Sequence, residues 1–148
     1  MAPSKTSDKE LLQELQANLH DHILKHGDNI LTIEAASFSL GSDDFKVTKS
    51  VNTVNTNLVT YNFQDTLRPK GNDFVISVTH NKFTKKTSDP LITRTGRGKF
   101  GITRTESYGY VATKHGKKEL KSFEKSKTTQ DVVQRAISKY SCNSSNFI

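Results

Sequence analysis

Residues 58–80 read LVTYNFQDTLRPKGNDFVISVTH, and the alternation within this stretch decides the fold. Apolar side chains occupy every second position in both halves: Val59, Tyr61, Phe63, Phe74, Ile76 and Val78. A period of two is typical of a strand with one buried face. Pro69 and Gly71 lie between the two runs and indicate a turn. We therefore predict an antiparallel hairpin with strands at about residues 58–66 and 73–83.

The same period extends outward over residues 29–113, which we predict to form an antiparallel sheet. Residues 30–40 alternate loosely, and residues 41–44, GSDD, have the composition of a turn. Two further strands are expected at residues 91–95 and 99–105, on either side of Gly96-Arg97-Gly98, and the alternation continues to Ala112. The basic segment that follows, residues 114–127, is expected to be a loop or a short helix.

A helix is predicted over residues 7–26. Ser7 and Glu10 have the spacing of a capping box, and Gly27 is a suitable C-terminal stop. One apolar stripe runs along it: Leu11, Leu12, Leu15, Leu19 and Ile23. Two interpretations of this stripe are equally compatible with the sequence. It packs within the monomer, or it forms an arm that packs on a neighbouring subunit.

A second helix is predicted at about residues 129–140, with Thr128 or Thr129 as its N-cap. The chain is therefore expected to be an α+β protein in which helices flank an antiparallel sheet meander. By length it is a single domain, residues 1–148. Its parts are an N-terminal helical arm (1–28), the sheet (29–113), and a basic segment with the C-terminal helix and tail (114–148).

Composition suggests a thin core. Only 32% of residues are hydrophobic, which is low for a globular domain. Either part of the chain is mobile or a second copy completes the core, so oligomerisation is an expectation from composition.

The charge is uneven along the chain. Residues 46–127 carry 17 Lys and Arg against 6 Asp and Glu, a net +11, whereas the first 40 residues carry a net −3. The whole chain has a net charge of +7. A basic surface attracts nucleic acid or another polyanion, although a Lys-rich surface also keeps ordinary proteins soluble.

Several classes of function find no support. No apolar run reaches the roughly 20 residues of a spanning helix, and the polar N-terminus predicts no secretory signal. The single cysteine, Cys142, excludes an intramolecular disulfide and a Cys-rich zinc site, and suggests a protein made in a reducing cytoplasm. His22 and His26 are four residues apart, but no third ligand follows, so we expect neither a metal nor a cofactor. No motif indicates an enzyme.

RNA binding on the polar face of the sheet has more support. Thr, Ser and Asn can bind base edges and 2′-hydroxyls, Arg and Lys can bind phosphates, and a tyrosine can stack on an unpaired base. The alternative is an ordinary solvated face, since antiparallel sheets commonly leave one side wet. The predicted RNA-binding residues are Thr60, Asn62, Ser77, Thr79, Asn81, Arg94, Lys99, Thr103, Arg104, Thr105 and Tyr108.

The meander, the hairpin at residues 58–80 and the C-terminal helix together resemble the coat protein of single-stranded RNA bacteriophages. The strand at residues 99–111 is similar to the one that carries a base-stacking tyrosine in that family, and residues 129–140 resemble the helix that clasps the partner subunit. The resemblance covers roughly residues 30–148. It departs from the family at the N-terminus, where a helix replaces the usual β-hairpin.

The resemblance implies an intertwined homodimer that assembles into an icosahedral shell around single-stranded RNA, made in the host cytoplasm and located in the virion. Its expected dimer interface is the apolar face of the second helix: Val132, Val133, Ala136, Ile137 and Tyr140. Two alternatives remain open at this point: a small basic cellular RNA-binding protein, and a phage tail or head-completion subunit that binds no RNA.

Overall fold

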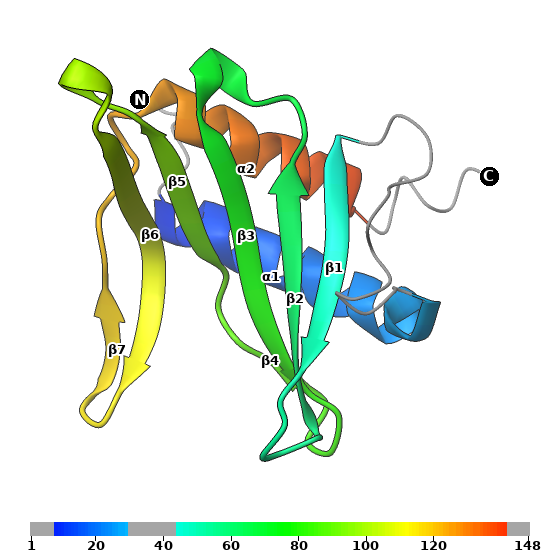
Figure 1. The fold of residues 1–148 in the computed structure, drawn as a ribbon. Helices are drawn as coiled ribbons and strands as arrows, with labels where there is room; N and C mark the ends of the chain where they lie inside the picture. The colour runs from blue at the N-terminus through cyan, green and yellow to red at the C-terminus, as the bar shows by residue number, and fades with distance from the viewer. Residues whose placement is uncertain (1–7, 30–43, 142–148) are drawn as a thin grey trace, which may run out of the picture.

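The computed structural model describes residues 8–29 and 44–141. They form two α-helices and one seven-stranded antiparallel sheet (Figure 1). The helices are α1 (Asp8–His26) and α2 (Lys127–Lys139). The strands are β1 (Phe45–Val51), β2 (Leu58–Asp65), β3 (Asp73–Asn81), β4 (Lys86–Thr87), β5 (Leu91–Arg97), β6 (Thr103–Thr113) and β7 (Gly116–Glu119). The sheet order is β1-β2-β3-β5-β6-β7, with β4 paired to the end of β3, so the α+β class and the meander are confirmed.

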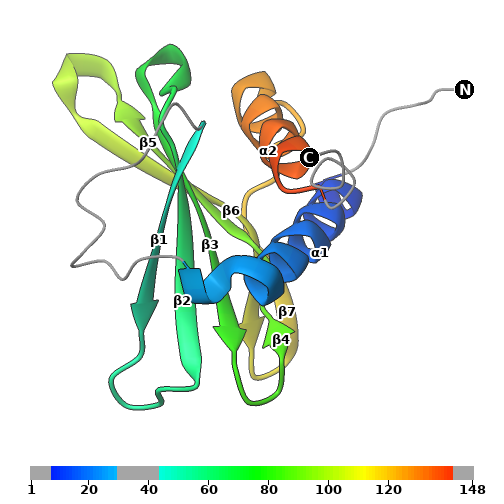
Figure 2. The ribbon, with the colours of Figure 1, turned by 90° about the vertical axis from the view of Figure 1, so that its right-hand side faces the viewer.

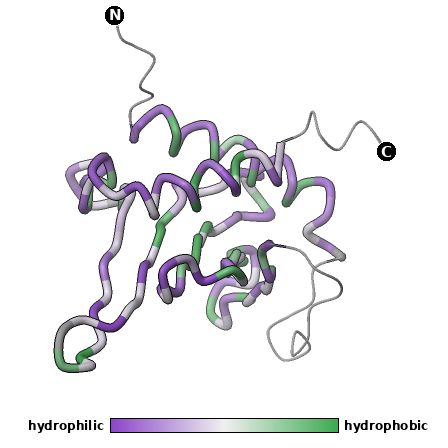
Figure 3. Tube along the Cα trace, turned by 90° about the horizontal axis from the view of Figure 1, so that it is seen from above, coloured by the Kyte–Doolittle hydropathy of each residue, from purple (hydrophilic) through white to green (hydrophobic). Residues whose placement is uncertain are grey.

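Both helices cover the same face of the sheet, as Figure 2 shows. The trace in Figure 3 alternates between hydrophilic and hydrophobic residues along the helices, as expected for amphipathic segments. The opposite face carries neither helix. This asymmetry divides the side chains of every strand into a helix-covered set and a set on what we call the open face.

The predicted hairpin is confirmed as β2 and β3. Tyr61 pairs with Val78, and Thr60 pairs with Thr79. All six alternating apolar side chains of residues 58–80 are buried in the core. Arg68, Lys70 and Gly71 in the connecting turn have positive φ angles of 49°, 54° and 76°, so the turn reverses the chain tightly after Pro69.

α1 packs on its own chain. Its predicted stripe, from Leu11 to Ile23, is buried in the same core cluster as the sheet. The carboxylate of Asp8 accepts hydrogen bonds from Ser122 Oγ at 2.7 Å and from the Phe123 backbone N–H at 2.9 Å. These bonds tie the first turn of α1 to the segment that enters α2. Of the two interpretations of the stripe, packing within the monomer is the arrangement in this structure.

α2 begins two residues earlier than the sequence predicts. Ser126 is its N-cap, because its Oγ accepts a hydrogen bond from the Thr129 backbone N–H at 3.3 Å. The predicted caps, Thr128 and Thr129, lie inside the helix and are buried. Ser126, Thr128 and Thr129 all have hydroxyl groups that can cap a helix. Ser126 is the cap in the structure because its backbone is extended.

Two strand predictions need correction. The sequence predicts a strand from residue 99, but Lys99–Gly101 is a 3₁₀ turn and β6 begins at Thr103. It predicts a loop or helix at residues 114–127, but they contain β7, which pairs with β6. All four residues of β7 are exposed, so no apolar alternation marks this strand in the sequence. The strand predicted at residues 30–40 and the Ser7 cap lie outside the described residues.

The described residues of one chain enclose a core of their own. Side chains from α1, α2 and strands β1, β2, β3, β5 and β6, together with Phe123, form one buried cluster. Composition suggested that a second copy completes the core, but this arrangement needs none to cover the two helical stripes. Self-association therefore stays a prediction that rests on other grounds.

A buried ion pair joins α2 to the end of β2. Arg135 donates two hydrogen bonds to the carboxylate of Asp65, at 2.9 and 3.0 Å, and its guanidinium carbon lies 5.3 Å from the centroid of the Phe45 ring. The Asp65 side chain is fully buried. The hydrogen bonds to Asp65 raise the pKa of Arg135. The pair thus fixes both the position of α2 and the edge of the sheet.

We predict that Arg135→Ala destabilises the protein by about 3 kcal/mol, because it leaves the carboxylate of Asp65 buried without its partner. Urea denaturation followed by circular dichroism would measure the change. The matched control is Lys127→Ala, which breaks the exposed Lys127–Asp131 pair on the same helix and should cost less than about 0.5 kcal/mol. Equal losses in the two variants would contradict the role given to the buried pair.

His22 is a half-buried polar group in the same layer. Its ring contacts the edge of Tyr140, at 4.7 Å between centroids, and lies near His26. Burial, with His26 and Lys139 nearby, lowers the pKa of His22 from 6.5 to about 4. The folded state therefore resists protonation of a group that the unfolded chain protonates readily.

We predict that His22 makes the free energy of unfolding fall as the pH drops from 6.5 to about 4. The stability that neutral His22 contributes is fully present above its pKa in the unfolded chain. It is lost as the pH falls to its pKa in the folded protein, because the unfolded state binds the proton first. Urea titrations at several pH values should show a weaker dependence in His22→Leu than in the wild type. His115→Leu, in the exposed turn between β6 and β7, is the control and should behave like the wild type.

Candidate nucleic-acid interface

The open face carries rows of mostly polar side chains that cross the strands, with Leu58, Val75, Leu91 and Val111 among them. Ser50, Thr60 and Thr79 form one row, and Asp73, Thr95 and Thr105 form another. The alternation with buried neighbours assigns further residues to this face: Lys46, Thr48, Asn62, Gln64, Ser77, Thr93, Arg97, Thr103, Ser107 and Lys118. The arrangement presents hydroxyl and amide groups at the strand spacing of about 4.8 Å.

Hydrogen bonds between neighbours order the centre of this face. Ser77 Oγ donates to Asn62 Oδ1 at 2.6 Å, which holds the amide in one orientation. The hydroxyls of Thr60 and Thr79 are 3.2 Å apart and bond to each other. A row of ordered donors and acceptors can bind a polar ligand without first losing much conformational entropy.

Six of the predicted RNA-binding residues lie on the open face: Thr60, Asn62, Ser77, Thr79, Thr103 and Thr105. Asn81 also falls on the open face in the alternation along β3, but its Oδ1 accepts hydrogen bonds from the backbone N–H groups of Phe83 and Thr84. Its side chain therefore shapes the turn after β3. The side chain of Lys99 lies outside the described part of the structure.

Arg94 and Arg104 are not on the open face. In the alternation along β5 and β6, both fall on the helix-covered side. Arg94 lies over the ring of Phe74, with 5.6 Å from its guanidinium carbon to the centroid, and donates to Ser126 Oγ at 3.2 Å. Arg104 is exposed near Gly98. The open face therefore contains few cations, and most of the positive charge lies at its ends.

Tyr108 cannot stack on a base in this structure. It is only 1% exposed and packs edge-on against Phe123 under the helices. Its hydroxyl donates to Glu106 Oε1 at 2.7 Å. The prediction grouped Tyr108 with the polar residues Thr103 and Thr105, but Tyr108 lies on the opposite face, and Ser107 is the residue that shares their face.

The expected dimer-interface residues lie inside the monomer. Val132, Val133 and Ala136 are fully buried, and Tyr140 is nearly so. Ile137 is partly buried against the same cluster. In this arrangement they cover the chain's own sheet.

Sequence reasoning missed the contribution of β1. Lys46, Thr48 and Ser50 alternate with the core residues Phe45 and Val47, so the signal was present in the sequence. Ser107 of β6 was also missed, although it continues the alternation of Thr103 and Thr105.

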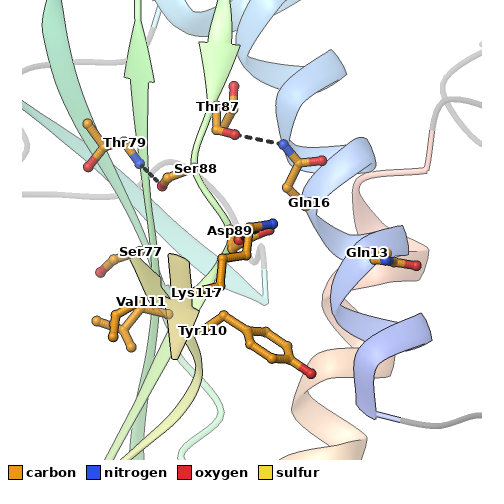
Figure 4. Close-up of a pocket in the computed structure, with 11 residues that line it drawn as sticks. Gln13, Gln16, Ser77, Thr79, Thr87, Ser88, Asp89, Tyr110, Val111 and Lys117 are labelled. Carbon is orange, nitrogen blue, oxygen red and sulfur yellow. Dashed lines mark hydrogen bonds and ion pairs between the residues drawn. The ribbon is translucent and has the colours of Figure 1, made fainter. Parts of the chain in front are cut away.

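The sheet splits at its lower end, and a pocket of about 680 Å³ lies in the split (Figure 4). β3 pairs with β5 only as far as Ser77 and then with β4, whereas β6 continues with β7. Gln16 Nε2 donates to the Thr87 carbonyl at 2.8 Å across this space, and Lys117 forms an ion pair with Asp89 at 2.9 Å. The hydrogen bond from Lys117 to Asp89 raises the pKa of Lys117.

The chemistry of this pocket is that of hydrogen bonding. Its lining includes Gln16, Ser77, Thr79 and Ser88, together with the ring of Tyr110. Burial raises the pKa of Tyr110 further above its usual value, and its hydroxyl can donate or accept a hydrogen bond at neutral pH. The hydroxyl of Thr87 in this lining hydrogen-bonds with ring nitrogens of His20, at 2.7 Å, and His80, at 2.9 Å. The pocket can hold a neutral polar group.

Metal and membrane sites find no support in residues 8–29 and 44–141. No cluster of three or more His, Cys, Asp or Glu side chains that could hold a metal ion is formed there. His22 and His26 lie with their rings 4.9 Å apart, within the packing around Tyr140. Neither described helix has the length and apolar character needed to cross a bilayer. Cys142 lies outside the described residues.

Comparisons with models of known protein families, with characterised proteins and with solved structures found no match to this chain.

Proposed function

We propose that this protein binds single-stranded RNA on the open face of its sheet. The observation that carries the proposal is the one-sided architecture, in which both helices cover one face and leave ordered rows of hydroxyl and amide groups on the other. Such groups suit base edges and 2′-hydroxyls, which distinguish RNA from DNA. The net charge of +7 supplies long-range attraction to phosphates.

In its finer form the proposal is that the chain is a structural coat protein, similar to that of single-stranded RNA bacteriophages. Dimers would assemble into an icosahedral shell with the open face inward against the genome and the helices outward, and the protein would be found in the virion. The contrast between the two faces of the sheet supports this, because a shell subunit needs one face for RNA and another for the exterior.

A second candidate is a cellular RNA-binding module that works as a monomer. The closed core favours it, since α1 and α2 bury their apolar stripes against their own sheet. Both candidates use the same open face and differ in assembly.

We predict that Asn62→Asp combined with Gln64→Glu weakens binding of single-stranded RNA by about tenfold or more at low salt, because it places two negative charges on the open face. Both changes are nearly isosteric, and a carboxylate at position 62 can still accept the hydrogen bond from Ser77 Oγ. Fluorescence anisotropy with a labelled oligonucleotide would measure the dissociation constant.

The control for this experiment is Gln134→Glu, an isosteric change at an exposed position of α2 on the helix-covered side. It should change the affinity by less than about threefold, through overall charge alone. If Gln134→Glu weakens binding as much as Asn62→Asp alone, which adds the same charge to the open face, the RNA lies elsewhere.

We predict that the purified protein elutes from size-exclusion chromatography as a dimer or larger particle with a nucleic acid absorbance spectrum, and that electron microscopy shows closed shells. A monomer that binds added RNA would favour the cellular module. A monomer that binds no RNA would contradict both candidates.

A further inference from the structure

A basic cleft lies at the end of the sheet formed by the β2–β3 turn and the β5–β6 hairpin. Two adjoining open hollows, of about 750 and 180 Å³, share Asn72, Arg94, Gly96 and Arg97 in their walls. The cations that line them lie in the β2–β3 turn, Arg68 and Lys70, and on the adjoining ends of β5 and β6, Arg94, Arg97 and Arg104. Of the three on the strands, Arg97 shares the open face, and Arg94 and Arg104 lie on the other side. We refer to this region as the terminal cleft.

The terminal cleft has an excess of positive charge. Its only carboxylates among the lining residues are Asp73 and Glu106. Asp73 forms an ion pair with Arg68 at 2.8 Å, and Glu106 forms one with Lys121 outside the cleft. Five cations against two carboxylates leave a net +3, and several of the cations are arginines, whose planar guanidinium groups suit phosphate oxygens.

The walls of the terminal cleft are held in place. Asn72 Nδ2 donates to the carbonyls of Pro69 and Lys70, which closes the β2–β3 turn. A Cβ atom at Gly96 would clash with Asn72 Oδ1, so the two turns approach as closely as they do because residue 96 is glycine. The β2–β3 turn and the end of β5 are therefore held against each other at this end of the sheet.

An exposed aromatic side chain stands beside this cleft. Phe100 is 96% exposed at the tip of the β5–β6 hairpin, and Ile102 is 63% exposed. The Gly98 backbone N–H donates to the Ile102 carbonyl at 2.6 Å, which closes the loop that presents the ring. A phenylalanine so fully in water contributes nothing to the core, and its ring is open to a partner.

We propose that the terminal cleft binds the phosphate backbone of single-stranded RNA while Phe100 stacks on an unpaired base. The inference rests on the proposed function and adds an anchoring site to it. The terminal cleft is continuous with the open face, because Thr95 and Thr103 belong to both. A strand of RNA can thus pass from the hydroxyl rows to the arginines, which supply the phosphate contacts that the open face lacks.

The first experiment tests the cations. Arg97→Gln combined with Arg104→Gln should weaken binding of a single-stranded oligonucleotide by about tenfold and reduce the slope of log affinity against log salt by about one to two. Both side chains are exposed and outside the core, so the fold should be retained. The matched control is Lys82→Gln with Lys114→Gln, which removes the same charge from exposed turns at the opposite end of the sheet and should change affinity by less than about threefold.

The second experiment tests stacking. The chain contains no tryptophan, so Phe100→Trp introduces a single tryptophan, which can be excited selectively, at the site. We expect its fluorescence to be quenched at saturating oligonucleotide. Phe100→Ala should weaken binding of the normal oligonucleotide by about fivefold or more, but should leave binding of an abasic oligonucleotide of the same length unchanged.

The outcomes separate this inference from the proposed function. If Asn62→Asp with Gln64→Glu weakens binding whereas the arginine pair and Phe100→Ala do not, the open face binds RNA and the terminal cleft does not. If none of these variants has an effect, both proposals fail. The fluorescence of Phe100→Trp could instead be unchanged by the oligonucleotide and shift to the blue with phosphatidylserine vesicles. That result would overturn the RNA assignment in favour of a membrane surface.

Discussion

The burial of a single face of the sheet under two helices is the constraint on which the rest of the structure depends. Alternation along β2 and β3 places large apolar side chains, such as Phe63 and Phe74, on one side only. Leaving them in water would cost about 2 kcal/mol each, so that side must be covered. Because α1 and α2 both cover it, the opposite face of the sheet is free to carry polar groups.

Polar contacts fix how the helices lie on this face. Asp8 ties the start of α1 to the segment before α2, and the Arg135–Asp65 pair ties α2 to the end of β2. Hydrophobic contact is non-directional and permits sliding of one layer on another. These directional contacts restrict the helices to one position, at the cost of burying charge that must stay paired.

The separation of charge from the hydroxyl rows bears on how a polyanion would bind. The centre of the open face offers hydrogen bonds from Thr60, Asn62 and Ser77, while the arginines gather at the terminal cleft. Hydroxyl and amide groups distinguish bases and sugars, whereas arginines contribute affinity that is independent of sequence. A ligand that spans both regions would obtain affinity at one end and selectivity along the sheet.

Local periodicity in the sequence determined the hairpin at residues 58–80, the stripe of α1 and the apolar residues of α2. Each of these features repeats between residues close together in the chain, within one helix or one pair of adjacent strands. It also placed six of the eleven expected RNA-binding residues on the open face. Only the tertiary structure decided that Tyr108 points into the core, that Arg94 lies over Phe74, and that α2 covers its own sheet. A period of two shows that side chains alternate between the faces, but it does not show whether Ser107 or Tyr108 points into the core. The docking of the helices depends on contacts between residues far apart in the chain, which local periodicity does not record.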